Sequence, residues 1–304
     1  MTRTSPSKTL ATLAGFSAIL MWSLLALLAA RSGAMPPFQL NAVTFGIGTL
    51  VGLAWLGARR LPARQALATF RQPWPVWLLG IGGLFGYHAL YFAALRNAPA
   101  AEASLIAYLW PLLIVLGSAM LPGERLRAHH LAGALLGFLG AGLLIASRGM
   151  TGFSATYSLG YAFAFVCAFL WSGYSLLSRR FAAVPSEVVA GFCAGTSLLS
   201  LVAHVLFETT VWPVDAFQWA AVALLGLLPV GAAFYVWDIG MKRGDVQLLG
   251  AASYAAPLLS TLVLVSAGEA AMTGTLALAA TLITLGAIFA ALPMFRTVLR
   301  RRSA

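Results

Sequence analysis

One histidine and two tyrosines lie within a helical turn of each other inside the apolar segment 74–95. On a helix, Tyr87, His88 and Tyr91 share a face, because residues three and four positions apart are neighbours. Phenol and imidazole groups donate and accept hydrogen bonds. An ionisable residue at such depth is expected to face protein or water. We therefore predict that this face binds a small polar molecule. The alternative is that a backbone carbonyl satisfies His88 without any contact to a ligand.

Other aromatic residues lie near the middle of further apolar segments. Trp and Tyr at segment ends are typical of membrane interfaces, but interfaces do not account for aromatic residues at mid-segment. The further candidate binding residues are Tyr108, Trp110, Trp171, Trp237 and Tyr254. Tyr108 and Trp110 lie about 200° apart on a regular helix, so both can face one site only if the helix turns between them.

Two prolines interrupt these apolar segments at similar depth, Pro111 in YLWPLL and Pro257 in YAAPLL. A proline inside a helix removes a backbone donor and clashes with the carbonyl four residues earlier, here that of Ala107 or Ser253. In lipid, a freed carbonyl is tolerated only where protein or water receives it. We predict that both prolines break their helices beside a cavity. The alternative is that they only kink the helices for packing.

The segments that carry these residues are expected to cross a membrane. The chain has 304 residues, of which 61% are hydrophobic and 9% charged, and its mean hydropathy is +0.89. A soluble core could not hide this much apolar surface. Segments of about 20 residues, the length that spans a bilayer, occur at 9–30, 38–57, 74–95, 99–121, 130–147, 157–178, 187–207, 218–241, 247–267 and 273–294. The predicted fold class is an all-α membrane protein with ten transmembrane helices.

The basic residues predict the orientation of these spans. The formal net charge is +11, but Lys and Arg lie in the gaps between spans and form no basic stripe, which argues against a nucleic-acid partner. With a cytoplasmic N-terminus, all of the 19 basic residues except Arg31, Arg96 and Arg148 lie on the cytoplasmic side. Positive charge favours the cytoplasmic side. We therefore expect both termini in the cytoplasm.

The chain contains an internal repeat. FSAILMWSLLALLAAR in the first span matches FVCAFLWSGYSLLSRR in the sixth, with Trp22 aligned to Trp171, and YLWPLL matches YAAPLL. The expected repeats cover 1–150 and 151–304, with five spans each. Because five is odd, the second repeat enters the membrane in the opposite direction. Inverted repeats are the common plan of secondary transporters, although they also occur in channels.

Charged and sulfur-containing residues elsewhere predict structural roles. Asp238 lies one turn before Lys242, which favours an ion pair on one helix. Acidic residues near span ends are expected to be solvated or to cap helices; they are Glu102, Glu187, Glu208 and Glu269. The two cysteines lie inside spans without metal-ligand spacing, so we expect no metal and no cofactor.

The motifs weigh against an enzyme and against a channel. The sequence has no HExxH run and no GxSxG turn, which would indicate a metalloprotease or a serine nucleophile. The span centres show neither the carboxylate rings nor the carbonyl filter of a channel. They also lack Lys, Arg, Asp and Glu, so a strongly charged substrate would find no partner. A zwitterionic amino acid fits better, and a lipophilic or cationic drug is the alternative substrate.

These motifs resemble a known family. The two five-span repeats, the prolines 111 and 257, and the Gly-Glu pairs at 123–124 and 268–269 resemble the drug/metabolite transporter superfamily (EamA type) across essentially the whole chain. YLWP, FYVWDIG and SYAAPLLS are similar to motifs of its YddG-like branch, exporters of aromatic and other neutral amino acids.

The resemblance implies a monomeric, multi-pass carrier in the inner membrane of a bacterium, surrounded by lipid. It also implies a central cavity walled by spans from both repeats. The lining residues that it favours are Tyr87, His88, Tyr91, Tyr108, Trp110 and Trp171.

Overall fold

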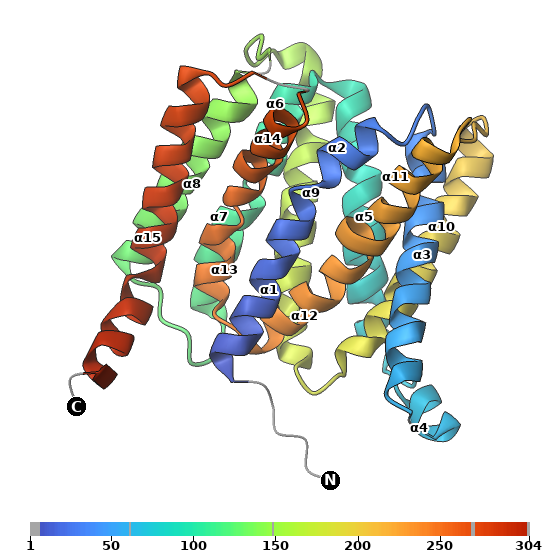
Figure 1. Ribbon diagram of the computed structural model, residues 1–304, viewed down its shortest axis with the longest axis horizontal. Coiled ribbons are helices and arrows are strands. Elements are labelled where there is room, and N and C mark those ends of the chain that lie inside the picture. Colours follow the sequence, from blue (N-terminus) through green and yellow to red (C-terminus); the bar gives the residue numbers. More distant parts are fainter. Residues whose placement is uncertain (1–6, 61, 148, 269–270, 303–304) are drawn as a thin grey trace.

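The computed structural model describes residues 7–302 except 61, 148, 269 and 270, so Arg148 and Glu269 lie outside the described residues. All regular secondary structure in the described residues is helical (Figure 1). The α-helices are α1 (Lys8–Trp22), α2 (Leu25–Ala30), α3 (Pro37–Ala58), α4 (Ala63–Ala68), α5 (Trp74–Asn97), α6 (Ala100–Ala107), α7 (Trp110–Gly117), α8 (Ala128–Ala146), α9 (Ser158–Ser178), α10 (Val189–Phe207), α11 (Ala216–Leu227), α12 (Ala233–Arg243), α13 (Val246–Ala252), α14 (Ala255–Ser266) and α15 (Gly274–Arg302). The single-turn 3₁₀ helices are η1 (Ser118–Met120), η2 (Ala155–Tyr157), η3 (Arg179–Phe181) and η4 (Ser186–Val188), and η5 (Leu228–Ala232) is a π-helix.

Nine of the ten predicted spans are helical stretches long and apolar enough to cross a membrane, counted over the described residues. They are Lys8–Ala30, Pro37–Ala58, Trp74–Asn97, Ala100–Met120, Ala128–Ala146, Ala155–Phe181, Ser186–Phe207, Ala216–Arg243 and Val246–Ser266. The predicted tenth span falls on α15, whose apolar stretch Gly274–Ala290 is shorter. The protein is therefore a multi-pass membrane protein.

The helices pack in pairs that join early and late parts of the chain. The most extensive pairs are α8 with α15, α3 with α10, α5 with α9 and α1 with α12, and α7 packs on α13. The α8–α15 pair depends on small residues. A Cβ added to Gly133 would lie 2.6 Å from the carbonyl oxygen of Gly286, and one added to Gly286 would lie equally close to that of Gly133. Such backbone approach is typical of membrane helix pairs.

Four of the spans are interrupted partway through the bundle. The first span breaks after Trp22, between α1 and α2, and the fourth breaks at Tyr108 and Leu109, between α6 and α7. The eighth contains η5, and the ninth breaks at Ser253 and Tyr254, between α13 and α14. Pro111 and Pro257 therefore lie within the first three residues after a break in their spans.

Both ends of the described chain lie at one end of the bundle, where α1 begins and α15 ends (Figure 1). We call this the terminal end. Ion pairs join separate segments there: Lys8 with Asp245 at 3.2 Å, and Arg179 with Glu124 at 2.7 Å. The Arg179 guanidinium also donates to the carbonyl oxygen of Gly244 at 3.0 Å. These contacts join the start of α1, η3 after α9, the loop before α8 and the link between α12 and α13.

Among the acidic residues, the expected Asp238–Lys242 pair and a cap by Glu208 are confirmed, whereas Glu102 and Glu187 are buried rather than solvated, and Glu187 forms an ion pair with Arg59. Asp238 and Lys242 form the expected ion pair on α12, at 2.9 Å. Glu208 accepts hydrogen bonds from the first-turn N–H groups of Phe38 and Gln39 and thereby caps α3. Glu102 likewise accepts from the N–H of Thr151 at 2.7 Å.

Candidate functional site

A cavity of about 270 Å³ lies among the four interrupted spans. Its lining residues from these spans are Trp22, Leu25, Ala26, Ser104, Ala107, Tyr108, Trp110, Pro229, Val230, Phe234, Ala256, Pro257 and Ser260. The remaining lining residues are Tyr87, His88, Tyr91, Ile145 and Trp171. Residues at or next to every interruption therefore line the cavity. This is expected, because irregular backbone at membrane depth is tolerated where it lines a cavity.

Tryptophan rings form one side of the cavity. The indole of Trp22 lies edge-on to those of Trp110 and Trp171, with ring centroids 6.4 and 5.8 Å apart. Phe234 packs against Trp22 and Trp171 at 6.2 and 5.7 Å. Edge-on packing holds each ring by its neighbours. The result is a rigid aromatic wall suited to a flat or apolar side chain.

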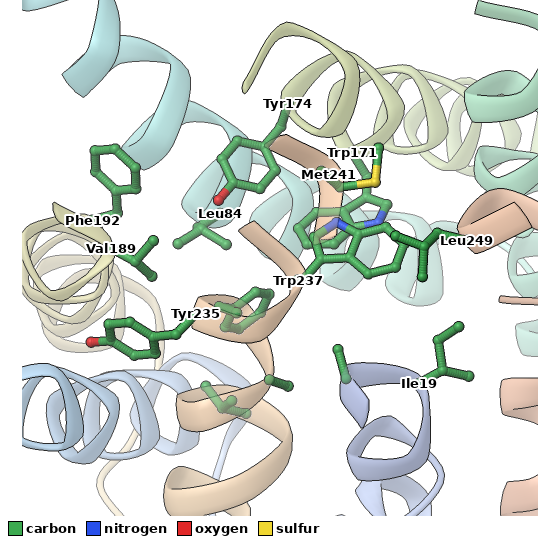
Figure 2. Close-up of a cluster of buried hydrophobic side chains, with 14 of the residues drawn as sticks. Ile19, Leu84, Trp171, Tyr174, Val189, Phe192, Tyr235, Trp237, Met241 and Leu249 are labelled. Carbon is green, nitrogen blue, oxygen red and sulfur yellow. The ribbon is translucent and has the colours of Figure 1, made fainter. Parts of the chain in front are cut away.

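Beneath this wall, toward the terminal end, the cavity is closed. Figure 2 shows Trp237, Met241, Leu249 and Ile19 within the buried core, and all four side chains have no solvent exposure. The indole of Trp237 lies 5.1 Å from that of Trp22. The opposite part of the cavity extends along α2, α6 and α14, away from the terminal end (Figure 1).

Polar groups of the cavity come from α5 and α6. Tyr91 and Ser104 share a hydrogen bond between their hydroxyls at 2.9 Å. His88 Nδ1 lies 2.7 Å from the carbonyl oxygen of Leu84. A carbonyl only accepts, so Nδ1 carries the proton and Nε2 of the neutral ring is an acceptor. A backbone carbonyl therefore binds the ring, and the ring also lines the cavity.

Two of the aromatic candidates lie outside the cavity lining. Trp237 is fully buried, and its Nε1–H donates to Ser175 Oγ at 3.1 Å. Tyr254 is also fully buried, and its hydroxyl accepts from the N–H of Leu112 at 3.0 Å. Mid-span position identified these residues, but position along a helix does not tell which side of it faces the cavity.

The two prolines differ in what they present to the cavity. Pro257 lines it, whereas Pro111 is buried outside the lining, although Ala107 lines it. Pro111 has no N–H to give to the Ala107 carbonyl. The expectation that Ser253 has a free carbonyl is wrong, because this oxygen accepts from the N–H of Ala256 at 3.1 Å. A tight turn within the ninth span therefore gives the Ser253 carbonyl a hydrogen-bond partner.

Sequence reasoning missed several lining residues. The internal repeat could have identified Trp22, because it aligns with the candidate Trp171. Phe234 lies within the quoted motif FYVWDIG, and Pro229 follows the same rule for mid-span prolines as Pro111. The break after Trp22 has no proline, so no comparable signal marks it.

The fold and the cavity define a class of protein: a multi-pass helical membrane protein with a central cavity lined by broken helices. The model of the EamA-like transporter family matches residues 9–146 and again 158–292. The chain belongs to the EamA-like transporter family, a class of transporters and not of enzymes. We call the matched parts the first and second EamA segments.

Individual relatives agree with this assignment. The chain is 60% identical to an aromatic amino acid exporter, YddG, of Ancylobacter novellus, over 94% of this chain and 98% of the relative. It is 27% identical to the aromatic amino acid exporter YddG of Salmonella typhimurium, over 83% of this chain and 86% of the relative. A solved crystal structure with 59% identity superposes with a TM-score of 0.91, over 96% of this chain and 99% of the other. These matches confirm the resemblance found in the motifs.

Proposed function

We propose that the protein exports aromatic and other neutral amino acids across the bacterial inner membrane. The observation that carries this proposal is the composition of the cavity: aromatic rings and hydroxyl groups line it, and no Lys, Arg, Asp or Glu occurs among its described lining residues. A volume of about 270 Å³ lies at the low end of small-molecule sites, which span roughly 300–1,000 Å³. The cavity therefore suits a single small metabolite without net charge.

The cavity offers a partner for each part of an amino acid. The substrate side chain packs against Trp22, Trp110 and Trp171. The ammonium donates to His88 Nε2, the acceptor left by the bond to Leu84, and the carboxylate accepts from hydroxyls such as Ser260. A role of His88 as donor to the carboxylate fits less well, because its Nδ1–H already donates to Leu84.

Transport proceeds by alternating access between two inverted five-span repeats, 1–150 and 151–304. The helix pairs support this division. If span n of the first repeat corresponds to span n + 5 of the second, the pairs α3–α10, α7–α13 and α8–α15 map onto themselves, and α1–α12 maps onto α5–α9. Two repeats packed in this way can exchange shapes around a shared site.

We place both termini in the cytoplasm. The buried core beneath the tryptophan wall and the ion pairs at the terminal end then close the cavity on the cytoplasmic side in this conformation. The positive-inside pattern of the basic residues supports this orientation. Each protein molecule acts as a monomeric carrier, with lipid around it and a cavity within a single chain.

Binding of the twenty amino acids to the purified protein tests the substrate class. Aromatic amino acids should bind most tightly, and neutral aliphatic ones should follow. Binding of lipophilic cations in place of amino acids would favour a multidrug exporter. Counterflow in proteoliposomes separates a carrier from a channel, because preloaded unlabelled substrate accelerates labelled uptake only through a carrier.

A further inference from the structure

Tyr254 is placed to complete a broken helix that belongs to the other EamA segment. The N–H groups at the start of a helix have no partner within that helix. Leu112 is the third residue of α7, and the hydroxyl of Tyr254 accepts from its N–H at 3.0 Å. Leu112 lies in the first EamA segment and Tyr254 in the second. The hydrogen bond therefore crosses between the segments at the point where each has a break.

The surroundings of Tyr254 fix its ring in this position. A Cβ added to Gly137 on α8 would lie 2.6 Å from Cδ2 of the ring, so only glycine leaves the ring its place. The ring of Phe138, the next residue on α8, also packs edge-on against that of Tyr254, with ring centroids 6.0 Å apart. On the α7 side, a Cβ at Gly250 would lie 3.2 Å from the carbonyl oxygen of Pro111, which keeps α13 and α7 in close contact. The hydroxyl is thus aimed at α7 by packing.

A second contact has the same design in the reverse direction. Trp22, next to the break between α1 and α2, donates from Nε1 to the carbonyl oxygen of Pro229 in η5, at 3.1 Å. Here a side chain of the first EamA segment reaches irregular backbone of the second. The two contacts connect all four interrupted spans in cross-segment pairs.

We propose that Tyr254 is a positioning residue that holds the break between α6 and α7 open across the segment interface. Without its hydroxyl, the N–H of Leu112 loses its acceptor at the start of α7. Without this contact α7 shifts relative to α6, and this shift moves Tyr108 and Trp110, both of which line the cavity. Tyr254 therefore shapes the cavity although it does not touch it. The effect of Tyr254 on the backbone of α7 does not depend on the proposed function. Its effect on substrate binding rests on that function.

Hydrogen–deuterium exchange tests the contact without any substrate. In Tyr254→Phe, the peptide covering residues 108–114 should exchange more than in the wild type, because the N–H of Leu112 loses its acceptor. Gly137→Ala should have the same effect by displacing the ring. Gly82→Ala is the matched control, since a Cβ at Gly82 meets no atom within 4 Å. Unchanged exchange in both test variants would overturn the proposal.

Binding of L-phenylalanine to the same purified variants tests the consequence for the cavity. The dissociation constant should rise several-fold for Tyr254→Phe and Gly137→Ala and stay at the wild-type value for Gly82→Ala. A lowered Tm with unchanged affinity would show that the hydroxyl serves stability alone and would overturn the positioning role. A wild-type protein that binds no amino acid would contradict the proposed function, while the exchange result would still decide the role of Tyr254.

Discussion

Truncation of His88 to alanine should weaken amino-acid binding by removing an acceptor for the substrate ammonium. The carbonyl of Leu84 takes the Nδ1–H at 2.7 Å, so Nε2 is the free acceptor of the neutral ring. A hydrogen bond to a charged group contributes about 1.5–3 kcal/mol. At 1.4 kcal/mol for each factor of ten, the dissociation constant of L-phenylalanine should rise roughly 10- to 150-fold.

Two substrate analogues separate the ammonium from the carboxylate. Phenethylamine keeps only the ammonium, and its affinity should fall in His88→Ala as that of L-phenylalanine does. 3-Phenylpropionate keeps only the carboxylate, and its affinity should not change. His88→Gln keeps an acceptor oxygen, so it should lose less affinity for L-phenylalanine than His88→Ala does. Binding is measured by titration calorimetry on purified protein, with His129→Ala, outside the cavity lining, as the control.

The opposite pattern would refute this reasoning. If affinity were lost for 3-phenylpropionate and kept for phenethylamine, the imidazole would be donating to the carboxylate. If the affinities for both analogues and for L-phenylalanine were unchanged, His88 would have no contact with the ligand, and its hydrogen bond to Leu84 would be its whole role.

Three further predictions follow from the breaks, the helix pairs and the charges. Pro111→Ala supplies an N–H for the Ala107 carbonyl and should impair transport in proteoliposomes. Pro257→Ala should keep most activity, because the Ser253 carbonyl already has a partner. Equal activity of the two variants would contradict this prediction. Gly133→Ala should lower the free energy of unfolding by about 1–3 kcal/mol through overpacking against α15, and a thermal melt with unchanged Tm would rule that out. Reporter fusions after residue 71 should report the cytoplasm and those near residue 150 the periplasm, and a reversed result at 150 would reject the division into five and five spans.

The sequence predicted the interrupted helices only where proline marks them. Proline has a definite local effect, so the sequence alone indicates breaks near Pro111 and Pro257. The break after Trp22 depends on packing against other helices, which no local pattern encodes. The π-helix η5 contains Pro229 and could have been suspected by the same rule.

The direction in which aromatic residues point was the weakest part of the prediction. In a membrane protein the helix surface facing lipid is as apolar as the surface facing the core, so hydrophobic periodicity does not orient the helix. Tyr108 and Trp110 both line the cavity because the break turns the chain between α6 and α7. Trp237 lies one turn after the lining residue Phe234 and is covered by Trp22 instead. Only the tertiary packing distinguishes these cases.

The uncharged lining of the cavity decides how voltage acts on the transporter. Moving one elementary charge across a membrane changes its energy by about 2.3 kcal/mol per 100 mV. A zwitterion has no net charge, and the described lining residues add no Lys, Arg, Asp or Glu to it. With His88 neutral, the loaded and the empty cavity therefore pass between the two sides without moving net charge. For the proposed substrate and the proposed alternating access, we therefore expect transport to be electroneutral and its rate to be independent of the membrane potential.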